Sequence, residues 1–322
     1  MKPSSWRRYD AAQRAFCTFH SEAYPARANP PTPPYDPAVV AEWVGDMVAH
    51  GSSSAATAVA ALNKHHVNGG GAPLRDTVAI QQALEGWGRL KTPPVPKKPF
   101  TAAMLASVKA LIDVTSLKGA RDFAMLVVAR AGAFRGESEL LAATLPLQLV
   151  AGGAEVHVHT KTDKSVHATS VRRIPAAGAQ GLAPLGALTH YLSLSGHTEG
   201  RVFRNVAGGG ARARSNTRPV SRSTLSNVVK TWAARLGFDP AEFATHSLKH
   251  GCVADLKYAD VSTAVATRVT GHASVRAYDG YGGAEAQRRA LAARRRQTRE
   301  ARATVVTTDA ALEAAAWQAA DL

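Results

Sequence analysis

The stretch Thr245-His246-Ser247-Leu248-Lys249-His250-Gly251, followed by Gly271-His272 and Tyr281, carries the strongest signal in the sequence. His246 and Lys249 are three residues apart, so on a helix they share a face and can hold one anion together. Gly271 is a good residue for ending a helix, which places the imidazole of His272 at a corner. Tyr281 follows nine residues later, far enough for the chain to turn and bring its phenol back. The pattern is unlike a metal cage or a nucleotide-binding loop and predicts a site for a phosphate group.

The length and composition indicate a globular protein. A chain of 322 residues has room for two domains, each with its own core. Hydrophobic residues make up 45% of the sequence, but no apolar run is long enough to span a membrane. The N-terminus lacks the apolar core of a signal peptide. The two cysteines, Cys17 and Cys252, lie far apart in the sequence, which favours a reduced, intracellular state.

The charge of the chain is strongly positive. Lys and Arg number 39 against 24 Asp and Glu, a net charge of +15, which predicts a polyanionic partner. Residues 201–235 hold eight Lys or Arg and no Asp or Glu. Residues 288–302 hold seven arginines and one acid, and three interpretations stay open for them. They can be a phosphate-contacting helix, a nuclear-localisation-like patch or a solvated face.

Proline-rich segments divide the chain. Residues 1–34 end in Pro30-Pro31-Thr32-Pro33-Pro34 and are expected to form an N-terminal extension with at most a short helix. Residues 35–92 start at a helix cap, Asp36-Pro37, and are expected to form a small helical domain. The Pro-Lys segment 93–99 reads as a linker, residues 100–283 as the larger domain, and residues 284–322 as a basic tail with a terminal Ala-rich helix.

The larger domain is expected to be mainly helical (α+β), with a small antiparallel sheet. Helical spacing occurs at 101–112, 121–130, 184–193, 223–236 and 260–270. The clear β signal is an alternating pair of segments, 155–162 and 166–174, joined by Asp163-Lys164-Ser165, with Lys161 near the tip of the hairpin. Residues 207–215, rich in Gly and Arg, are expected to form a loop.

Four local patterns, in this order along the chain, resemble the boxes of the tyrosine recombinases, the phage integrase family. They are Ala133-Phe134-Arg135-Gly136-Glu137-Ser138-Glu139-Leu140-Leu141, Thr160-Lys161-Thr162, His246-Ser247-Leu248-Lys249-His250-Gly251, and Gly271-His272 with Tyr281. They look like the family's first-arginine box, its catalytic-lysine turn, its His-x-x-Arg box and its Gly-His to Tyr spacing. A helical N-terminal region with a linker near residue 95 is similar to the family's core-binding domain. The resemblance covers about residues 36–282.

The resemblance implies a DNA strand-transfer enzyme that needs no metal, cofactor or ATP. Four side chains would surround the scissile phosphate: Arg135, His246, Lys249 and His272. Tyr281 would attack the phosphorus to give a 3′-phosphotyrosyl link and a 5′-hydroxyl, and Lys161 would protonate the departing 5′ oxygen. The expected partner is double-stranded DNA, clamped by two domains of a homo-oligomer (dimer or tetramer), with no membrane involved.

Two positions depart from the family pattern. Lys249 stands where the family has its second arginine, so the charge is kept but the planar fork that binds two phosphate oxygens is lost. Ser138 stands where an acid usually follows the first arginine, and either Glu137 or Glu139 could orient Arg135. Each of two roles also has a rival nearby. Lys164 competes with Lys161, and Tyr278 with Tyr281.

Other interpretations of the same residues predict different behaviour. A recombinase-derived protein that binds DNA but has lost chemistry would also carry Lys249 in the box. A helical scaffold for RNA or protein would use the basic surface without needing Tyr281. His246 and His250 have the four-residue spacing of helical zinc ligands, but no glutamate lies between them and no third ligand is evident.

Overall fold

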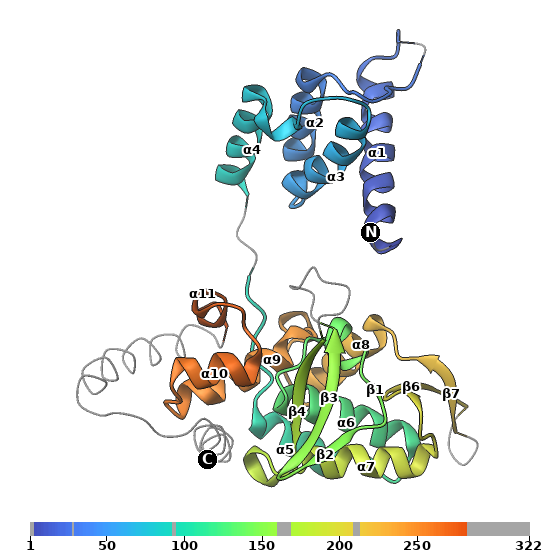
Figure 1. Cartoon of the computed structure of the whole chain (residues 1–322), viewed down its shortest axis with the longest axis vertical. Coiled ribbons are helices and arrows are strands. Elements are labelled where there is room, and N and C mark those ends of the chain that lie inside the picture. Colours follow the sequence, from blue (N-terminus) through green and yellow to red (C-terminus); the bar gives the residue numbers. More distant parts are fainter. Residues whose placement is uncertain (1–2, 28, 92–94, 160–168, 209–212, 282–322) are drawn as a thin grey trace, which may run out of the picture. The chain divides into compact units, whose positions relative to one another are not determined.

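The computed structural model describes residues 3–27, 29–91, 95–159, 169–208 and 213–281. The chain divides into two compact units, Met1–Val95 and Pro96–Leu322 (Figure 1). The division falls inside the segment 93–99 that the prolines indicated as a linker.

The N-terminal unit is a helical bundle. Its elements are α1 (Pro3–Ala23), α2 (Pro37–Ala49), α3 (Ala55–Asn68), the 3-10 turn η1 (Leu74–Asp76) and α4 (Val78–Leu90). α2 starts as its sequence predicts, because the Asp36 side chain accepts a hydrogen bond from the Ala38 amide and Pro37 occupies the first turn. Apolar faces of all four helices meet in one buried cluster that includes Val40, Trp43 and Leu62.

Helix α1 corrects the expected domain boundary at residue 35. It is 21 residues long, and Phe16 on its inner face is 1% exposed. The Phe16 ring packs edge-on against Tyr35 and Trp43, with centroids 5.1 and 5.3 Å apart. Residues 3–23 are therefore part of the N-terminal core rather than an extension, since their aromatic side chains complete the apolar cluster.

Replacing Phe16 tests this assignment. Phe16→Ala removes a buried ring from the cluster and is expected to lower the free energy of unfolding by about 3 to 5 kcal/mol. The matched control is Leu90→Ala in α4, whose side chain is 73% exposed, and a change within about 0.5 kcal/mol is expected. Urea unfolding followed by circular dichroism and tryptophan fluorescence measures both. If both substitutions lower the free energy of unfolding by the same small amount, residues 3–23 are an extension and not part of the core.

The C-terminal unit contains most of the helices. They are α5 (Ala102–Leu111), α6 (Leu117–Ala131), α7 (Pro184–Ser195), α8 (Arg222–Arg235), α9 (His246–Tyr258), α10 (Thr263–Thr270) and α11 (Val275–Asp279). Three shorter turns are η2 (Gly136–Leu140), η3 (Ala179–Gly181) and η5 (Pro240–Glu242). Thr101, Ser116 and Ser221 cap α5, α6 and α8 by accepting hydrogen bonds from first-turn amides.

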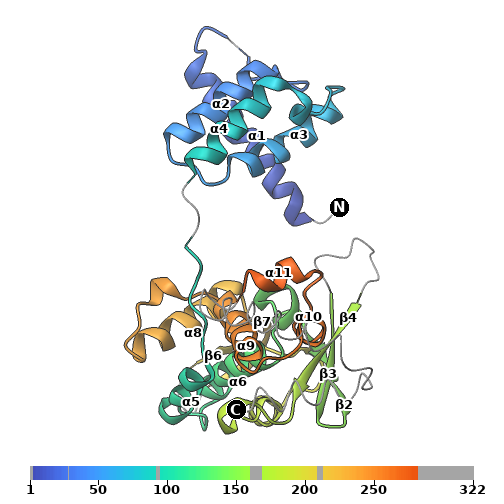
Figure 2. The same cartoon turned by 90° about the vertical axis from the view of Figure 1, so that its left-hand side faces the viewer.

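Small antiparallel sheets complete this unit. The strands are β1 (Thr144–Leu145), β2 (Gln148–Val150), β3 (Gly153–His159), β4 (Thr169–Pro175), β5 (Gly200–Arg201), β6 (Arg204–Ala207) and β7 (Arg214–Pro219). The largest sheet has the order β2-β3-β4 and sets Val156 opposite Arg172. α9 and α10 stand on the β4 side of this sheet (Figures 1 and 2). The predicted hairpin is present as β3 and β4, although its tip, with Lys161, lies outside the described residues.

The strands β6 and β7 flank the expected loop at 207–215 and overlap it only at its ends. Ala207 ends β6, Arg214 and Ser215 begin β7, and Val206 pairs with Ser215. β7 reads Arg-Ser-Asn-Thr-Arg-Pro and has no apolar alternation, so it gives no β signal in the sequence. Backbone pairing with β6 makes it a strand.

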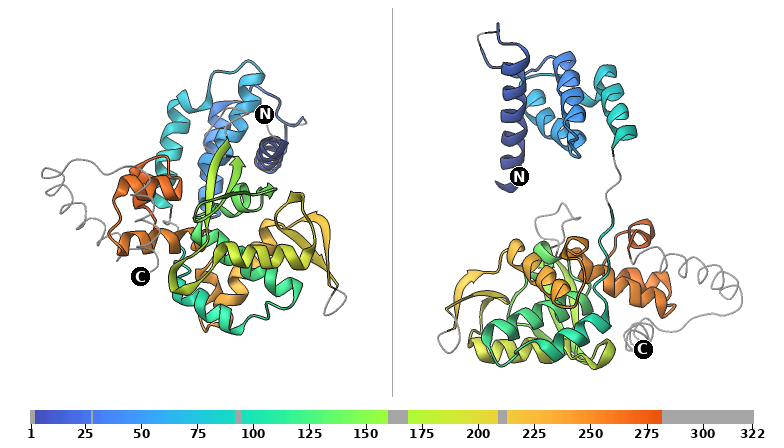
Figure 3. Two further views of the ribbon diagram at one scale, coloured as in Figure 1. Left: turned by 60° about the horizontal axis from the view of Figure 1, so that its bottom comes forward. Right: turned by 180° about the vertical axis from the view of Figure 1, so that it is seen from behind.

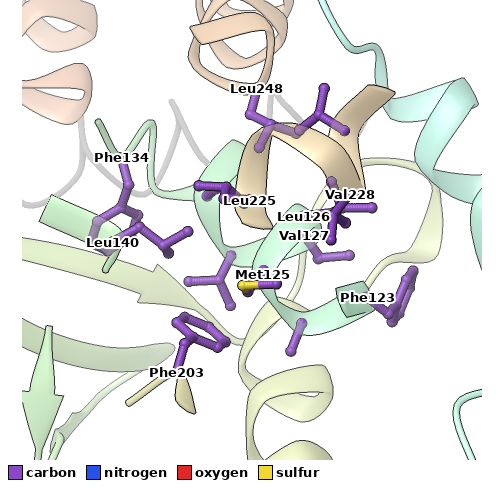
Figure 4. Packing of buried hydrophobic residues seen from close by; sticks show 14 of the residues in the cluster. Phe123, Met125, Leu126, Val127, Phe134, Leu140, Phe203, Leu225, Val228 and Leu248 are labelled. Atoms are coloured by element: carbon purple, nitrogen blue, oxygen red, sulfur yellow. The ribbon is translucent and has the colours of Figure 1, made fainter. Parts of the chain in front are cut away.

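Helix α6 is the centre of the C-terminal core. Twelve of its residues are buried, because neighbouring elements cover it on all sides. Met125, Leu126 and Val127 of α6 lie among Phe203, Leu225 and Val228 in Figure 4. Seen from below and from behind, α10 and α11 lie at the opposite end of the unit from the β6–β7 hairpin (Figure 3). The mainly helical architecture with small antiparallel sheets agrees with the predicted fold class.

None of the helices in the described part of the chain is both long and apolar enough to cross a membrane.

Candidate functional site

A buried carboxylate, Glu139, organises the candidate site. The chain turns sharply at Ala133, whose φ is 49°. The π-type turn η2 follows and places Glu139 in the interior, where the residue is 0% exposed. Its Oε2 accepts the Arg135 amide at 2.8 Å, and its Oε1 accepts Arg135 Nη1 at 2.8 Å. Of the two glutamates that the sequence left open, Glu139 is the one that contacts Arg135; the side chain of Glu137 lies outside what the structure describes.

A second arginine, Arg172 of β4, shares the same carboxylate. Its Nη2 donates to Glu139 Oε1 at 3.2 Å, and the residue is 4% exposed. The sequence analysis missed it, although a signal was present. Arg172 and Ile174 are two apart on a strand, so they lie on one face, and Ile174 is in the core. An arginine that lies on the same face of a strand as core residues is the pattern that identifies it.

Gly271 lets β4 and α10 approach closely. It ends α10 in the left-handed conformation, with φ of 61°. A Cβ built there would lie 1.9 Å from both Nη atoms of Arg172. The position therefore requires glycine for its backbone conformation and for space, and the guanidinium of Arg172 lies directly against the turn that leads to His272.

Lys249 is buried rather than presented to solvent. It is 1% exposed, and its Nζ donates to the Thr270 carbonyl at 2.6 Å, at the C-terminal end of α10 where a cation is favoured. Burial, then Arg135 and Arg172, lower the pKa of Lys249 to about 7, although Glu139 acts in the opposite direction. His246 is exposed at the first residue of α9, so the two residues do not present equivalent cations on one helix face.

His272 is held as a neutral imidazole. The Thr270 hydroxyl donates to the Ala266 carbonyl at 2.6 Å, so His272 Nδ1 donates to Thr270 Oγ1, at 2.7 Å. Nε2 is then an acceptor in the neutral ring, and it is buried with no hydrogen-bond partner among the described residues. Burial, followed by Lys249 and Arg135, lowers the pKa of His272 to about 3.

Tyr281 lies against two imidazoles. Its ring centroid is 4.4 Å from that of His250 and 4.7 Å from that of His272. Burial raises the pKa of the Tyr281 phenol, while Arg135 lowers it and Glu139 raises it. The rival, Tyr278, is 2% exposed and belongs to a small apolar cluster with Val253 and Leu256. His250, considered in the sequence only as a zinc ligand, is thus a neighbour of the half-buried phenol.

The predicted site residues fall into three groups. Four of them form a chain of contacts: Arg135 is bonded to Glu139, Lys249 and His272 are both bonded to Thr270, and the ring of Tyr281 lies against that of His272. His246 stands at the entrance of α9 and acts on the pKa of its neighbour His250. Lys161 lies outside the described residues. In the part of the chain that the structure describes, no three His, Cys, Asp or Glu side chains are grouped to hold a metal ion.

The charges of the cluster are unbalanced in favour of an anion. Arg135, Arg172 and Lys249 surround one carboxylate, Glu139, and the neighbouring His272 is neutral. Burial by itself would raise the pKa of Glu139, but Arg172, the Arg135 amide and Lys249 outweigh it and hold that pKa below its ordinary value. The excess positive charge suits a phosphate diester.

Removing the carboxylate should destabilise the protein. Glu139→Gln keeps the shape but leaves buried cations without their counter-charge, so a loss of about 3 to 5 kcal/mol in the free energy of unfolding is expected at neutral pH. The pKa of Glu139 is lowered in the folded state, so its contribution is present above the ordinary value of 4.5 and is lost as pH falls through the folded pKa. The difference between wild type and Glu139→Gln should therefore shrink in acid.

Urea unfolding at neutral and acid pH measures this difference. Glu199→Gln is the matched control, because Glu199 is exposed on the same unit, and an effect within about 0.5 kcal/mol is expected. A pH-independent loss in Glu139→Gln would contradict the assigned ionisation of Glu139.

Comparison with known proteins adds a relative in sequence and several in fold. No family model matches the chain. The chain is 25% identical over 248 residues to an "Integrase/recombinase xerD homolog" of Selenomonas ruminantium, an alignment that covers 75% of this chain and 71% of the relative.

Solved structures of DNA-bound recombinases share the fold. The Tn1549 transposon integrase in complex with transposon right-end DNA has a TM-score of 0.61 at 14% identity and covers 94% of this chain and 95% of its own. A lambda integrase dimer bound to a COC′ core site has a TM-score of 0.58 at 15% identity, with 89% and 73% covered. The XerH site-specific recombinase in a post-cleavage complex with difH has a TM-score of 0.57 at 14% identity, with 89% and 78% covered.

The relative in sequence and the shared fold agree with the ordered boxes of the sequence, and all three make the chain similar to the tyrosine recombinases.

Proposed function

We propose that this protein cuts and rejoins DNA strands through a 3′-phosphotyrosyl intermediate on Tyr281, without a metal ion or ATP. The observation that carries the proposal is the contact of Tyr281 with His272, which itself lies beside the cation cluster of Arg135, Arg172 and Lys249. A phenol and a site with excess positive charge thus meet at one place. The integrase/recombinase of similar sequence and the DNA-bound structures of the same fold support it.

The chemistry follows from the charge that develops at phosphorus. Attack by the Tyr281 oxygen forms a new bond to phosphorus and breaks the bond to the 5′ oxygen. The additional negative charge on the nonbridging oxygens is stabilised by Arg135 and Lys249, and His246 can donate to the same oxygens. The resemblance also assigns His272 to this cradle, a role that requires its Nε2 to carry a proton in the complex with DNA. The phenol gives its proton to solvent, which Arg135 favours by lowering the pKa of the phenol, and the 5′ oxygen gains a proton from Lys161. The phosphotyrosyl bond conserves the energy needed for rejoining.

Double-stranded DNA is the proposed partner, bound by a homo-oligomer. The net charge of +15 and the exposed arginines Arg214, Arg218 and Arg222 supply contacts to phosphates. Affinity is therefore expected to fall steeply as salt rises. The lambda integrase relative is a dimer on its core site, which supports assembly of two or more copies here.

Tyr281→Phe tests the nucleophile. On a nicked duplex whose cleaved fragment diffuses away, the wild-type protein should accumulate a covalent adduct, detected on a denaturing gel. Tyr281→Phe should bind the duplex and form no adduct, because the phenol oxygen is missing. Tyr278→Phe is the matched control, since that ring is packed in the core, and it should form adduct as wild type does. An adduct formed by Tyr281→Phe would contradict the proposal.

A second function, DNA binding with weakened chemistry, rests on Lys249. Burial of this lysine and its pKa of about 7 mean that its charge is partly lost near neutral pH, unlike that of an arginine. A large gain in adduct formation by Lys249→Arg would favour a DNA-binding protein that has lost most of its catalytic activity. An unchanged or lower rate is expected instead, because a side chain that is 1% exposed and bonded to the Thr270 carbonyl leaves little room for a longer one.

Proton uptake on DNA binding tests the charge of Lys249. A group with a pKa of about 7 is mostly neutral near pH 8, and an adjacent phosphate raises that pKa, so binding should take up as much as about one proton there. Near pH 6 the lysine is already charged, and its uptake should vanish. Titration calorimetry in buffers of different protonation enthalpy measures the number. Lys249→Arg should abolish the uptake near pH 8, and equal uptake in both proteins would exclude Lys249 as its source.

A further inference from the structure

Lys257 occupies a place in α9 where an apolar residue is expected. It is 3% exposed, and it follows Val253, Ala254 and Leu256, all of which are buried. A buried ammonium group costs free energy unless polar groups surround it. None of the four boxes includes this residue, and the chemistry described above does not use it.

The ammonium group of Lys257 is directed at the segment that carries Tyr281. Its Nζ donates to the Tyr281 carbonyl at 2.6 Å and to the Asp279 carbonyl at 3.2 Å. It also lies 4.9 Å from the centroid of the Tyr278 ring, within the range of a cation–π interaction. Three residues of one short segment therefore contact the same cation.

The segment needs such support. α11 is five residues long, and a helix of that length is not stable by itself. Ser274 caps its start, and the carbonyls at its end are the groups that a helix leaves unsatisfied. A lysine at a helix C-terminus satisfies these carbonyls and interacts favourably with their dipoles.

Lys257 contacts Asp279 and Tyr281 through their backbone carbonyls, and it also lowers the pKa of His250 and of His272. The charged groups that change the pKa of the Tyr281 phenol are Arg135 and Glu139. Positioning and activation of the nucleophile are thus assigned to different cations.

We infer that Lys257 is a positioning residue, which holds the backbone at Tyr281 so that the phenol oxygen meets the scissile phosphate. The inference rests on the proposed function for its catalytic consequence. Its structural content, that Lys257 fixes the place of Tyr281, is independent of the reaction.

Lys257→Met is the primary test in the full-length protein. Methionine keeps the length of the side chain and removes the charge and the donor. The rate of adduct formation at saturating nicked duplex should fall roughly tenfold to a hundredfold, because small displacements of a reacting group have effects of this size. The dissociation constant for the duplex, measured by fluorescence anisotropy, should stay within about twofold of wild type, and the shape of the pH–rate profile should not change.

Two further variants separate positioning from general structure. Lys257→Arg keeps a cation and donors, and it should recover part of the rate that Lys257→Met loses. Lys109→Met is the matched control, an exposed lysine on α5 of the same unit, and its rate should equal that of wild type. A rate within about threefold of wild type in Lys257→Met, a parallel loss of DNA affinity, or a shifted pH profile would overturn the inference.

A spectroscopic measurement reads the position of Tyr281 without the reaction. The protein is labelled with 3-fluorotyrosine, and the ¹⁹F signal of residue 281 is assigned by its loss in Tyr281→Phe. Lys257→Met should shift or broaden this signal, and Lys257→Arg should restore it in part. An unchanged signal would overturn the inference.

These outcomes keep the two proposals separable. If the wild-type protein forms no Tyr281-dependent adduct, the proposed function fails, and the ¹⁹F signal still decides whether Lys257 holds the segment. If Lys257→Met does not fold, Lys257→Gln, which keeps a neutral donor, is read in the same assays. Failure of both to fold would overturn the inference, because Lys257 would then be a general structural residue.

Discussion

The site depends on one carboxylate shared by two guanidinium groups. Glu139 accepts from Arg135 of the corner after α6 and from Arg172 of β4, and it is fully buried. Arg172 in turn lies against Gly271, at the turn that leads to His272. Three segments far apart in the sequence are thereby held by a single anionic group. Because a buried charge that loses its partner is costly, each of these segments is constrained by the others.

This arrangement sets the protonation states around the proposed phosphate site. Burial and the neighbouring cations keep His272 neutral and reduce the charge of Lys249 near neutral pH. An arriving phosphate would reverse the effect on Lys249, since an anion stabilises the ammonium form. The charge of the site thus depends on its ligand, a property that an arginine in the place of Lys249 would not have.

The sequence predicted what depends on local spacing and missed what depends on pairing across the fold. Capping residues such as Asp36 and Thr101 identify helix starts because the cap acts within one turn. The ordered boxes predict one set of six residues, which are Arg135, Lys161, His246, Lys249, His272 and Tyr281. Arg172 was missed because its partner, Glu139, is 33 residues away. The strand β7 was missed because its polar sequence pairs only through the backbone. Residues 3–23 were expected to form at most a short helix in an extension, because the partners of their aromatic side chains lie on other elements.

The oxygen of Tyr281 must be placed more precisely than charge interactions alone can achieve. Charges around a phosphate act over several ångströms, so the cluster tolerates small movements, but a bond-forming oxygen must be placed within a fraction of that distance. Tyr281 follows a five-residue helix, which has little stability of its own. Contacts from α9 supply the missing rigidity, through Lys257 to the backbone and through Leu256 and Val253 to the ring of Tyr278. α9 therefore serves both needs, since its first half carries Lys249 toward the charge cluster and its last turn carries Lys257 toward the nucleophile.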